Sequence, residues 1–171
     1  MSPELDKKLC SKYPELFRDR NGNPKNTAMC WGFECGDGWY SLIESICEYL
    51  MLDVNRLKSR IASDYFDNTE KEKMKLELIE AEKKVPVVLQ VKEKFGGLRF
   101  YVDGAATVKQ FEYINFAENF SYRICEECGT MKDVMTYGIG WNKTLCNTHA
   151  DKQYGYQAET YRETIRKSEN D

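Results

Sequence analysis

The chain has one histidine, little net charge and no long apolar run, and each shortage excludes a class of protein. A single imidazole, on His149, leaves little scope for hydrolytic chemistry that uses histidine as acid or base. The net charge of −3 gives no long-range attraction to nucleic acid. No stretch approaches the roughly 18 uninterrupted apolar residues of a transmembrane helix. The charged, amphipathic start lacks the apolar centre of a signal peptide, so we expect a cytoplasmic protein.

What the chain does contain is enough apolar surface for a core. Its 171 residues are 42% hydrophobic and 13% aromatic, which favours one domain or one domain with a small appendage. Seven cysteines is an odd number, and without an export signal a disulfide framework is not expected. Reduced thiols that bind a metal are the better interpretation.

Four residues have the spacing of a closed zinc site. They are Cys125, Cys128, Cys146 and His149. Each Cys-x2-Cys/His pair forms a knuckle, and the 17 residues between the pairs (129–145) can fold as a hairpin. Four protein ligands leave no open position for water, so we expect a structural Zn²⁺ in a treble-clef-like finger. The alternative is a group of buried thiols beside a hydrogen-bonded histidine.

Apolar periodicity predicts helices before and after a β-hairpin. Residues recurring at three and four positions favour a helix over 43–65, with a break near Asp53, and another over 107–123. Thr69 and Glu72 have capping-box spacing and are expected to open a charged helix that ends before Pro86.

The domain organisation follows from these elements. We expect an α+β fold, in which a helical body over 1–123 surrounds a central antiparallel hairpin at 87–102. A zinc finger over 124–150 packs on this body. The residues from 151 to 171 are expected to form a polar tail with a frayed end.

The hairpin is predicted to turn at Gly96-Gly97, as a two-residue turn of the primed type. In that register Lys94 lies opposite Arg99, and Lys92 opposite Tyr101, all on the outer face.

Three cations and a phenol on one surface invite an anion such as a phosphate or a carboxylate of a partner. The alternative is an ordinary solvated face whose cations point into water.

An aromatic and glycine-rich segment over 29–40 is the second candidate binding element. Its glycines would let a planar ligand approach the backbone while the aromatic rings stack on it. The aromatic residues are Trp31, Phe33, Trp39 and Tyr40. In the alternative interpretation these rings fold back onto the long helix as core.

The other cysteines have no common metal-site spacing. Cys30 and Cys35 are too far apart for a knuckle, so a second metal would need Cys10 or Cys47 as well. Inert buried thiols are the simpler interpretation.

Three blocks of sequence carry a resemblance. They read CWGFECGDGWY (30–40), VKEKFGGLRFY (91–101) and, within 125–150, CEECG followed by GWNKTLCNTHA. Over residues 1–150 the chain resembles a family of small uncharacterised phage and prophage proteins with a C-terminal Cys3His zinc finger. The resemblance assigns no reaction. It implies an accessory protein made in the cytoplasm of an infected bacterium, where such proteins often counter host defence.

These observations favour a non-enzymatic protein that binds a small anionic, nucleotide-derived ligand between the aromatic loop and the hairpin cations. A protein-interaction module that inhibits a host protein is the alternative, with helix 69–84 and Trp141 as its surface. A nucleic-acid-binding finger is less favoured, because residues 121–150 carry equal numbers of cations and carboxylates. An enzyme would have to rely on Glu93, a carboxylate with no evident catalytic partner. The sequence leaves open whether the protein forms homo-oligomers.

Overall fold

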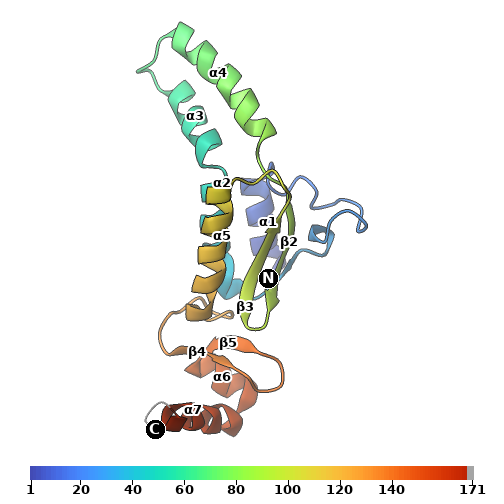
Figure 1. Ribbon diagram of the computed structural model, residues 1–171, viewed down its shortest axis with the longest axis vertical. Coiled ribbons are helices and arrows are strands. Elements are labelled where there is room, and N and C mark those ends of the chain that lie inside the picture. Colours follow the sequence, from blue (N-terminus) through green and yellow to red (C-terminus); the bar gives the residue numbers. More distant parts are fainter. Residues whose placement is uncertain (169–171) are drawn as a thin grey trace.

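Within residues 1–168 the helical and alternating segments of the sequence fold into seven α-helices and two small sheets, and the fold class is α+β as predicted. The computed structural model describes residues 1–168. In Figure 1 the helical hairpin α3–α4 and the C-terminal finger lie at opposite ends of an elongated molecule. The helices and strands are α1 (Pro3–Lys12), β1 (Phe33–Glu34), α2 (Tyr40–Leu50), α3 (Leu52–Ala62), α4 (Asn68–Lys83), β2 (Val88–Lys94), β3 (Gly97–Val102), α5 (Val108–Phe120), β4 (Val134–Tyr137), β5 (Lys143–Cys146), α6 (Asn147–Tyr154) and α7 (Tyr156–Ser168). Three 3-10 turns complete the list at Met29–Trp31, Asp37–Trp39 and Ser121–Arg123.

The sheet of the body has three strands in the order β1-β2-β3. Strands β2 and β3 form the predicted antiparallel hairpin, and the short strand β1 pairs with β2 in parallel. Val91 and Phe100 are cross-strand partners on the buried face, where they join the core formed with α1, α2 and α5. Burial of these apolar side chains is the main force that holds the sheet against the helices.

The hairpin turn lies one residue earlier than predicted. Phe95 and Gly96 both have positive φ, 55° and 79°, as a primed turn requires, so Gly97 belongs to β3. A Cβ on Gly97 would overlap the ring of Tyr122, which explains this glycine without the turn. The predicted pairs are therefore wrong: Lys92 lies opposite Arg99, Lys94 opposite Gly97, and Gln90 opposite Tyr101.

The helices confirm the predicted segments with shifted ends. The long helix over 43–65 breaks at Met51 into α2 and α3. The capping box of α4 is formed by Asp67 and Glu70, two residues before the predicted pair, because both pairs fit the same short pattern. Thr107 caps α5 with Gln110 as its partner. None of the helices described within residues 1–168 is both long enough and apolar enough to cross a bilayer.

The C-terminal region forms a second core. Leu145, Tyr137 and Ala150 are fully buried there, in a cluster separate from that of the body. Residues 156–168, predicted as part of a polar tail, form helix α7. Ala158 is buried, and the guanidinium of Arg162 donates to the hydroxyl of Tyr137 at 3.1 Å, so this helix belongs to the finger. The remainder of the predicted tail, 169–171, lies outside the described residues.

Candidate metal centre and neighbouring surfaces

Three local elements bring the four predicted metal ligands together. Cys125 and Cys128 lie on a knuckle after the 3-10 turn Ser121–Arg123, Cys146 ends β5, and His149 lies in the first turn of α6. Gly129 follows Cys128 with a φ of +76°, a left-handed conformation that glycine adopts readily at the end of the knuckle. A knuckle, a hairpin and a ligand-bearing helix in this order make the treble-clef-like arrangement that the sequence predicted.

The ligand atoms have the spacing of a tetrahedral metal site. All four lie within 4.8 Å of one another. The sulfurs of Cys128 and Cys146 are 4.0 Å apart, and Nδ1 of His149 lies 3.2 Å from Cys146 Sγ and 3.6 Å from Cys125 Sγ. Zinc–sulfur bonds of about 2.3 Å place tetrahedral sulfurs about 3.8 Å apart, so the geometry fits a closed shell of three sulfurs and one nitrogen.

The polypeptide around Cys125 favours its thiolate. Burial acts to raise the pKa of this thiol, but backbone N–H groups of Cys146, Cys128 and Glu127 outweigh it, and the pKa is lowered. A metal binds the thiolate form, so these N–H donors prepare the ligand.

Comparison with known proteins adds no family to this description. No protein family, no curated protein and no solved structure matches the chain.

The aromatic and glycine-rich segment lies against the metal knuckle. Glu126 joins the two by two contacts: its carbonyl accepts from Gly38 N at 2.7 Å, and its Oε1 accepts from Gly36 N at 3.0 Å. Its own N–H donates to the carbonyl of Thr144 within the finger. A Cβ on Gly38 would overlap the carbonyl oxygen of Cys125. The glycines thus allow two backbones to approach each other rather than a ligand.

The aromatic residues of this segment do not form a stacking pocket. Trp39 is fully buried and donates its indole N–H to the carbonyl of Ile124 at 3.0 Å. Phe33 is also buried, with its ring at 5.2 Å from that of Phe17. Tyr40 donates its hydroxyl to Glu44, and only Trp31, 71% exposed, presents its ring to solvent. The alternative interpretation, in which rings fold into the core, describes Trp39 and Phe33.

The cations of the hairpin lie on its outer face but are partly engaged. Arg99 donates to the carbonyl of Leu98 and to the hydroxyl of Tyr122. Lys92 lies opposite the carboxylate-bearing Glu34 on β1 and over the ring of Tyr101. Lys94 lies next to the turn, with its ammonium over the ring of Phe95. The structure does not bring these side chains together with the rings of Trp39 and Phe33, so the eight predicted ligand-binding residues form no common site.

Glu93 has a structural role at the junction of hairpin and finger. Its carboxylate accepts from the N–H of Gly96 at 2.6 Å and from the indole N–H of Trp141 at 3.2 Å. Thr144 Oγ1 reaches the same turn and donates to the carbonyl of Gly96 at 2.6 Å. The finger therefore binds the tip of the β-hairpin through hydrogen bonds, and Trp141 takes part in this contact.

The remaining cysteines do not assemble a second metal site. Within residues 1–168 the four-residue group at the finger is the only cluster of metal-binding side chains. Burial raises the pKa of Cys10 and of Cys35 to about 12, and it raises that of the fully buried Cys47 as well. These thiols are protonated at neutral pH and pack as small apolar groups.

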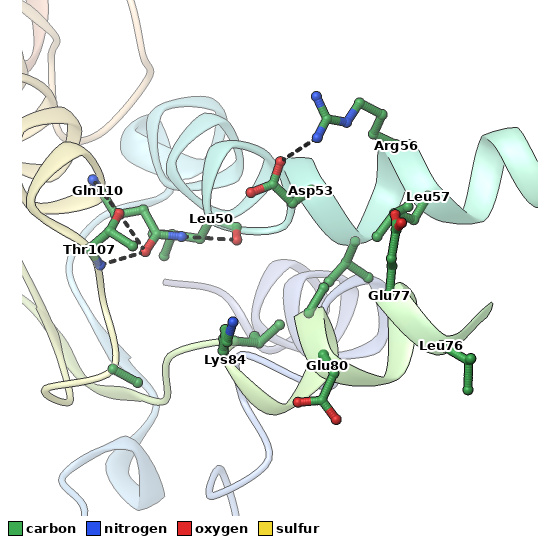
Figure 2. A pocket seen from close by; sticks show the side chains of 14 residues that line it. Leu50, Asp53, Arg56, Leu57, Leu76, Glu77, Glu80, Lys84, Thr107 and Gln110 are labelled. Atoms are coloured by element: carbon green, nitrogen blue, oxygen red, sulfur yellow. Dashed lines mark hydrogen bonds and ion pairs between the residues drawn. The ribbon is translucent and has the colours of Figure 1, made fainter. Parts of the chain in front are cut away.

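A groove that was not predicted from the sequence lies at the other end of the molecule. It lies between α3, α4 and the start of α5 and has a volume of about 660 Å³ (Figure 2). Aliphatic side chains from α2, α3, α4 and the segment after α4 line it, including Leu50, Val54 and Val85, and charged side chains line its edges. We refer to it as the hairpin groove, after the helical hairpin α3–α4 and not the β-hairpin β2–β3. The sequence feature that pointed to it is Leu76, an apolar residue of α4 outside the row formed by Met74, Leu78 and Ala81. In the structure its side chain is 67% exposed.

Proposed function

We propose that this protein is a protein-binding module, completed by one structural zinc ion, which holds a segment of a partner protein in the hairpin groove. The observation that carries the proposal is the exposed apolar surface along α4. Leu76 lines the groove, and Ile79, three residues on and 50% exposed, continues that surface beyond it. Apolar surface that extends past a pocket favours a macromolecular partner over a small ligand.

The lining of the groove supports binding rather than chemistry. Its residues include no cysteine, no histidine and no aromatic side chain. It therefore offers neither an activated nucleophile nor a ring on which a nucleotide base would stack.

Zinc is the metal that the ligand set favours. Three thiolates and one imidazole in a tetrahedron suit Zn²⁺, and a closed shell gives it a structural role. The ion would hold the finger against the segment at 36–39 and the hairpin tip. In the setting that the phage resemblance implies, the partner is a protein of the infected host.

Photocrosslinking tests the proposed function. A photoreactive amino acid at Leu76, in protein produced in a bacterial host, should yield a discrete covalent adduct with a partner. Ala105 is an exposed residue on the rim of the groove, so Ala105→Trp should fill the groove and remove the adduct. The matched control is Val108→Trp, because Val108 is 75% exposed and does not line the groove.

The adduct should persist in the Val108→Trp control. The proposal fails if Leu76 gives no adduct, or if the Ala105→Trp variant keeps it while its melting temperature is unchanged.

A further inference from the structure

The hairpin groove carries two charges that form no ion pair within residues 1–168. Of the charged side chains along its edges, Asp53 pairs with Arg56 at 3.2 Å and Glu80 pairs with Lys83 at 2.7 Å. Within residues 1–168 neither Glu77 nor Lys84 forms an ion pair. Lys83 contacts the carboxylate of Glu80 and lowers the pKa of that carboxyl, and the charge of Lys84 helps to lower it without forming an ion pair. Glu77 lies on α4 and Lys84 directly follows the last residue of that helix, and Figure 2 shows them at separate positions along the groove.

The spacing of Glu77 and Lys84 sets the distance between the two charges that a partner must match. Seven residues separate Glu77 from Lys84 in the sequence, which is about two turns or 10 Å of helix. A helix that lies along α4 repeats with the same period, so a pair of opposite charges seven residues apart on such a helix meets both side chains.

The walls of the groove select a helical occupant. Helices α2 to α5 and the loops that follow α4 and precede α5 form the walls, so no strand edge is available for an added β-strand. An extended proline-rich segment needs aromatic side chains, and the lining has none. An amphipathic helix fits, because its apolar stripe can cover Leu76, which is 67% exposed, above a floor of the buried residues Val54 and Leu57. Its flanking charges then reach the rim.

We infer that the partner segment is an amphipathic helix that carries one basic and one acidic residue two turns apart, paired with Glu77 and Lys84. This inference rests on the proposed function and specifies the chemistry of the partner. The ion pair Asp53–Arg56 on α3 contributes little to the selection of a partner helix, because its two charges already neutralise each other.

Synthetic helical peptides of about 16 residues test the inference. All share one leucine stripe and differ at two positions seven residues apart, which hold Lys and Glu, two Lys, or two Glu. The leucine stripe is laid out symmetrically, so the mixed peptide can lie in the direction in which its Lys meets Glu77 and its Glu meets Lys84. Fluorescence anisotropy gives the affinity of each labelled peptide for the full chain.

The wild-type protein should bind the mixed peptide about tenfold more tightly than either like-charged peptide, since one attractive pair becomes repulsive. The Glu77→Lys variant should prefer the doubly acidic peptide, and Lys84→Glu the doubly basic one. The matched control Asp53→Arg/Arg56→Asp reverses a satisfied pair and should leave the wild-type order unchanged. Raising the salt concentration should reduce the preference.

Each other outcome overturns the inference. Equal affinities for the three peptides, or an order that Glu77→Lys and Lys84→Glu do not change, exclude this charge recognition but leave the groove as a binding site. Binding that survives Ala105→Trp places the peptides elsewhere. A dimer of the protein that Ala105→Trp disperses in analytical ultracentrifugation makes a second copy the occupant. If no peptide binds, the inference fails, and the crosslinking at Leu76 decides separately on the proposed function.

Discussion

The indole N–H of Trp39 donates to the carbonyl oxygen of Ile124 at 3.0 Å, one residue before the first metal ligand. This hydrogen bond lies in a fully buried setting and joins the start of α2 to the metal knuckle. Together with the contacts of Gly36 and Gly38 to Glu126, it makes the segment at 36–39 the attachment of the finger to the body.

Replacing Trp39 by Phe should weaken this attachment. The variant leaves the buried carbonyl of Ile124 without its donor and removes part of a packed ring, so unfolding free energy should fall by about 2–3 kcal/mol. Urea denaturation measures the change. The matched control is Trp31→Phe at a 71% exposed position, which should alter stability by less than about 0.5 kcal/mol. Equal effects of the two substitutions would refute a special role for Trp39.

A methyl group at Gly38 should disturb the knuckle directly. The added Cβ in Gly38→Ala would overlap the carbonyl oxygen of Cys125, so the backbones must separate, and we expect a loss of about 2 kcal/mol or more and a weaker hold on the metal. Thermal unfolding and competition with a metal chelator measure both effects. Gly104→Ala is the control, because nothing lies within 4 Å of a Cβ there, and it should leave stability and metal retention unchanged. A Gly38→Ala protein that behaves like the control would contradict the close approach.

Glu118 should make stability depend on pH. Burial raises the pKa of its carboxyl, although the N–H of Phe100, at 2.8 Å from Oε1, and the charge of Arg99 act in the opposite direction. The folded protein then holds this proton more tightly than the unfolded chain, so this residue's contribution to stability decreases as pH rises from the unfolded to the folded pKa.

The Glu118→Gln variant tests this sign. It keeps an oxygen that can accept from Phe100 N–H and removes the titration, so its stability should exceed that of the wild type above the folded pKa and lose the advantage in acid. Melting temperatures of both proteins across the acidic range give the comparison. An advantage that grows in acid would reverse the predicted sign.

The contact between the finger and the tip of the β-hairpin should depend on Glu93. Glu93→Ala removes the acceptor for both Gly96 N–H and the indole of Trp141, and we expect a loss of about 1–2 kcal/mol. Because Trp141 is largely exposed, its fluorescence reports the change without unfolding of the core. Glu112→Ala, on the surface of α5, is a suitable control with no expected change. Unaltered stability in Glu93→Ala would show that this contact contributes nothing to the free energy of unfolding.

The metal centre was predictable because its signal is local. Ligand type and spacing within each Cys-x2-Cys/His pair depend on knuckle geometry alone, and Cys125 to His149 assemble as the sequence indicated. The caps of helices are local too, but Asp67–Glu70 and Thr69–Glu72 overlap, and the pattern does not choose between them.

The hairpin register and the aromatic segment were not predictable, since tertiary contacts decide them. Gly97 is required by the ring of Tyr122, and Gly38 by the backbone of Cys125, and neither neighbour is close in sequence. Helix α7 carried a weak signal in the spacing of Ala158 and Tyr161 that its many charges obscured. The hairpin groove arises only when α3, α4 and α5 meet, so no single segment reveals it.

We propose that the metal centre maintains the fold at one end of the molecule. Partner binding takes place at the other end, in the hairpin groove, and does not need the metal. Hydrogen exchange of the zinc-loaded and chelator-treated protein tests it most directly, with native mass spectrometry to count the ions. The account predicts one zinc ion whose removal strips protection from residues 124–154 and 36–39 and leaves α3 and α4 protected. Equal loss of protection in α3–α4, or unchanged protection at the finger, would contradict it.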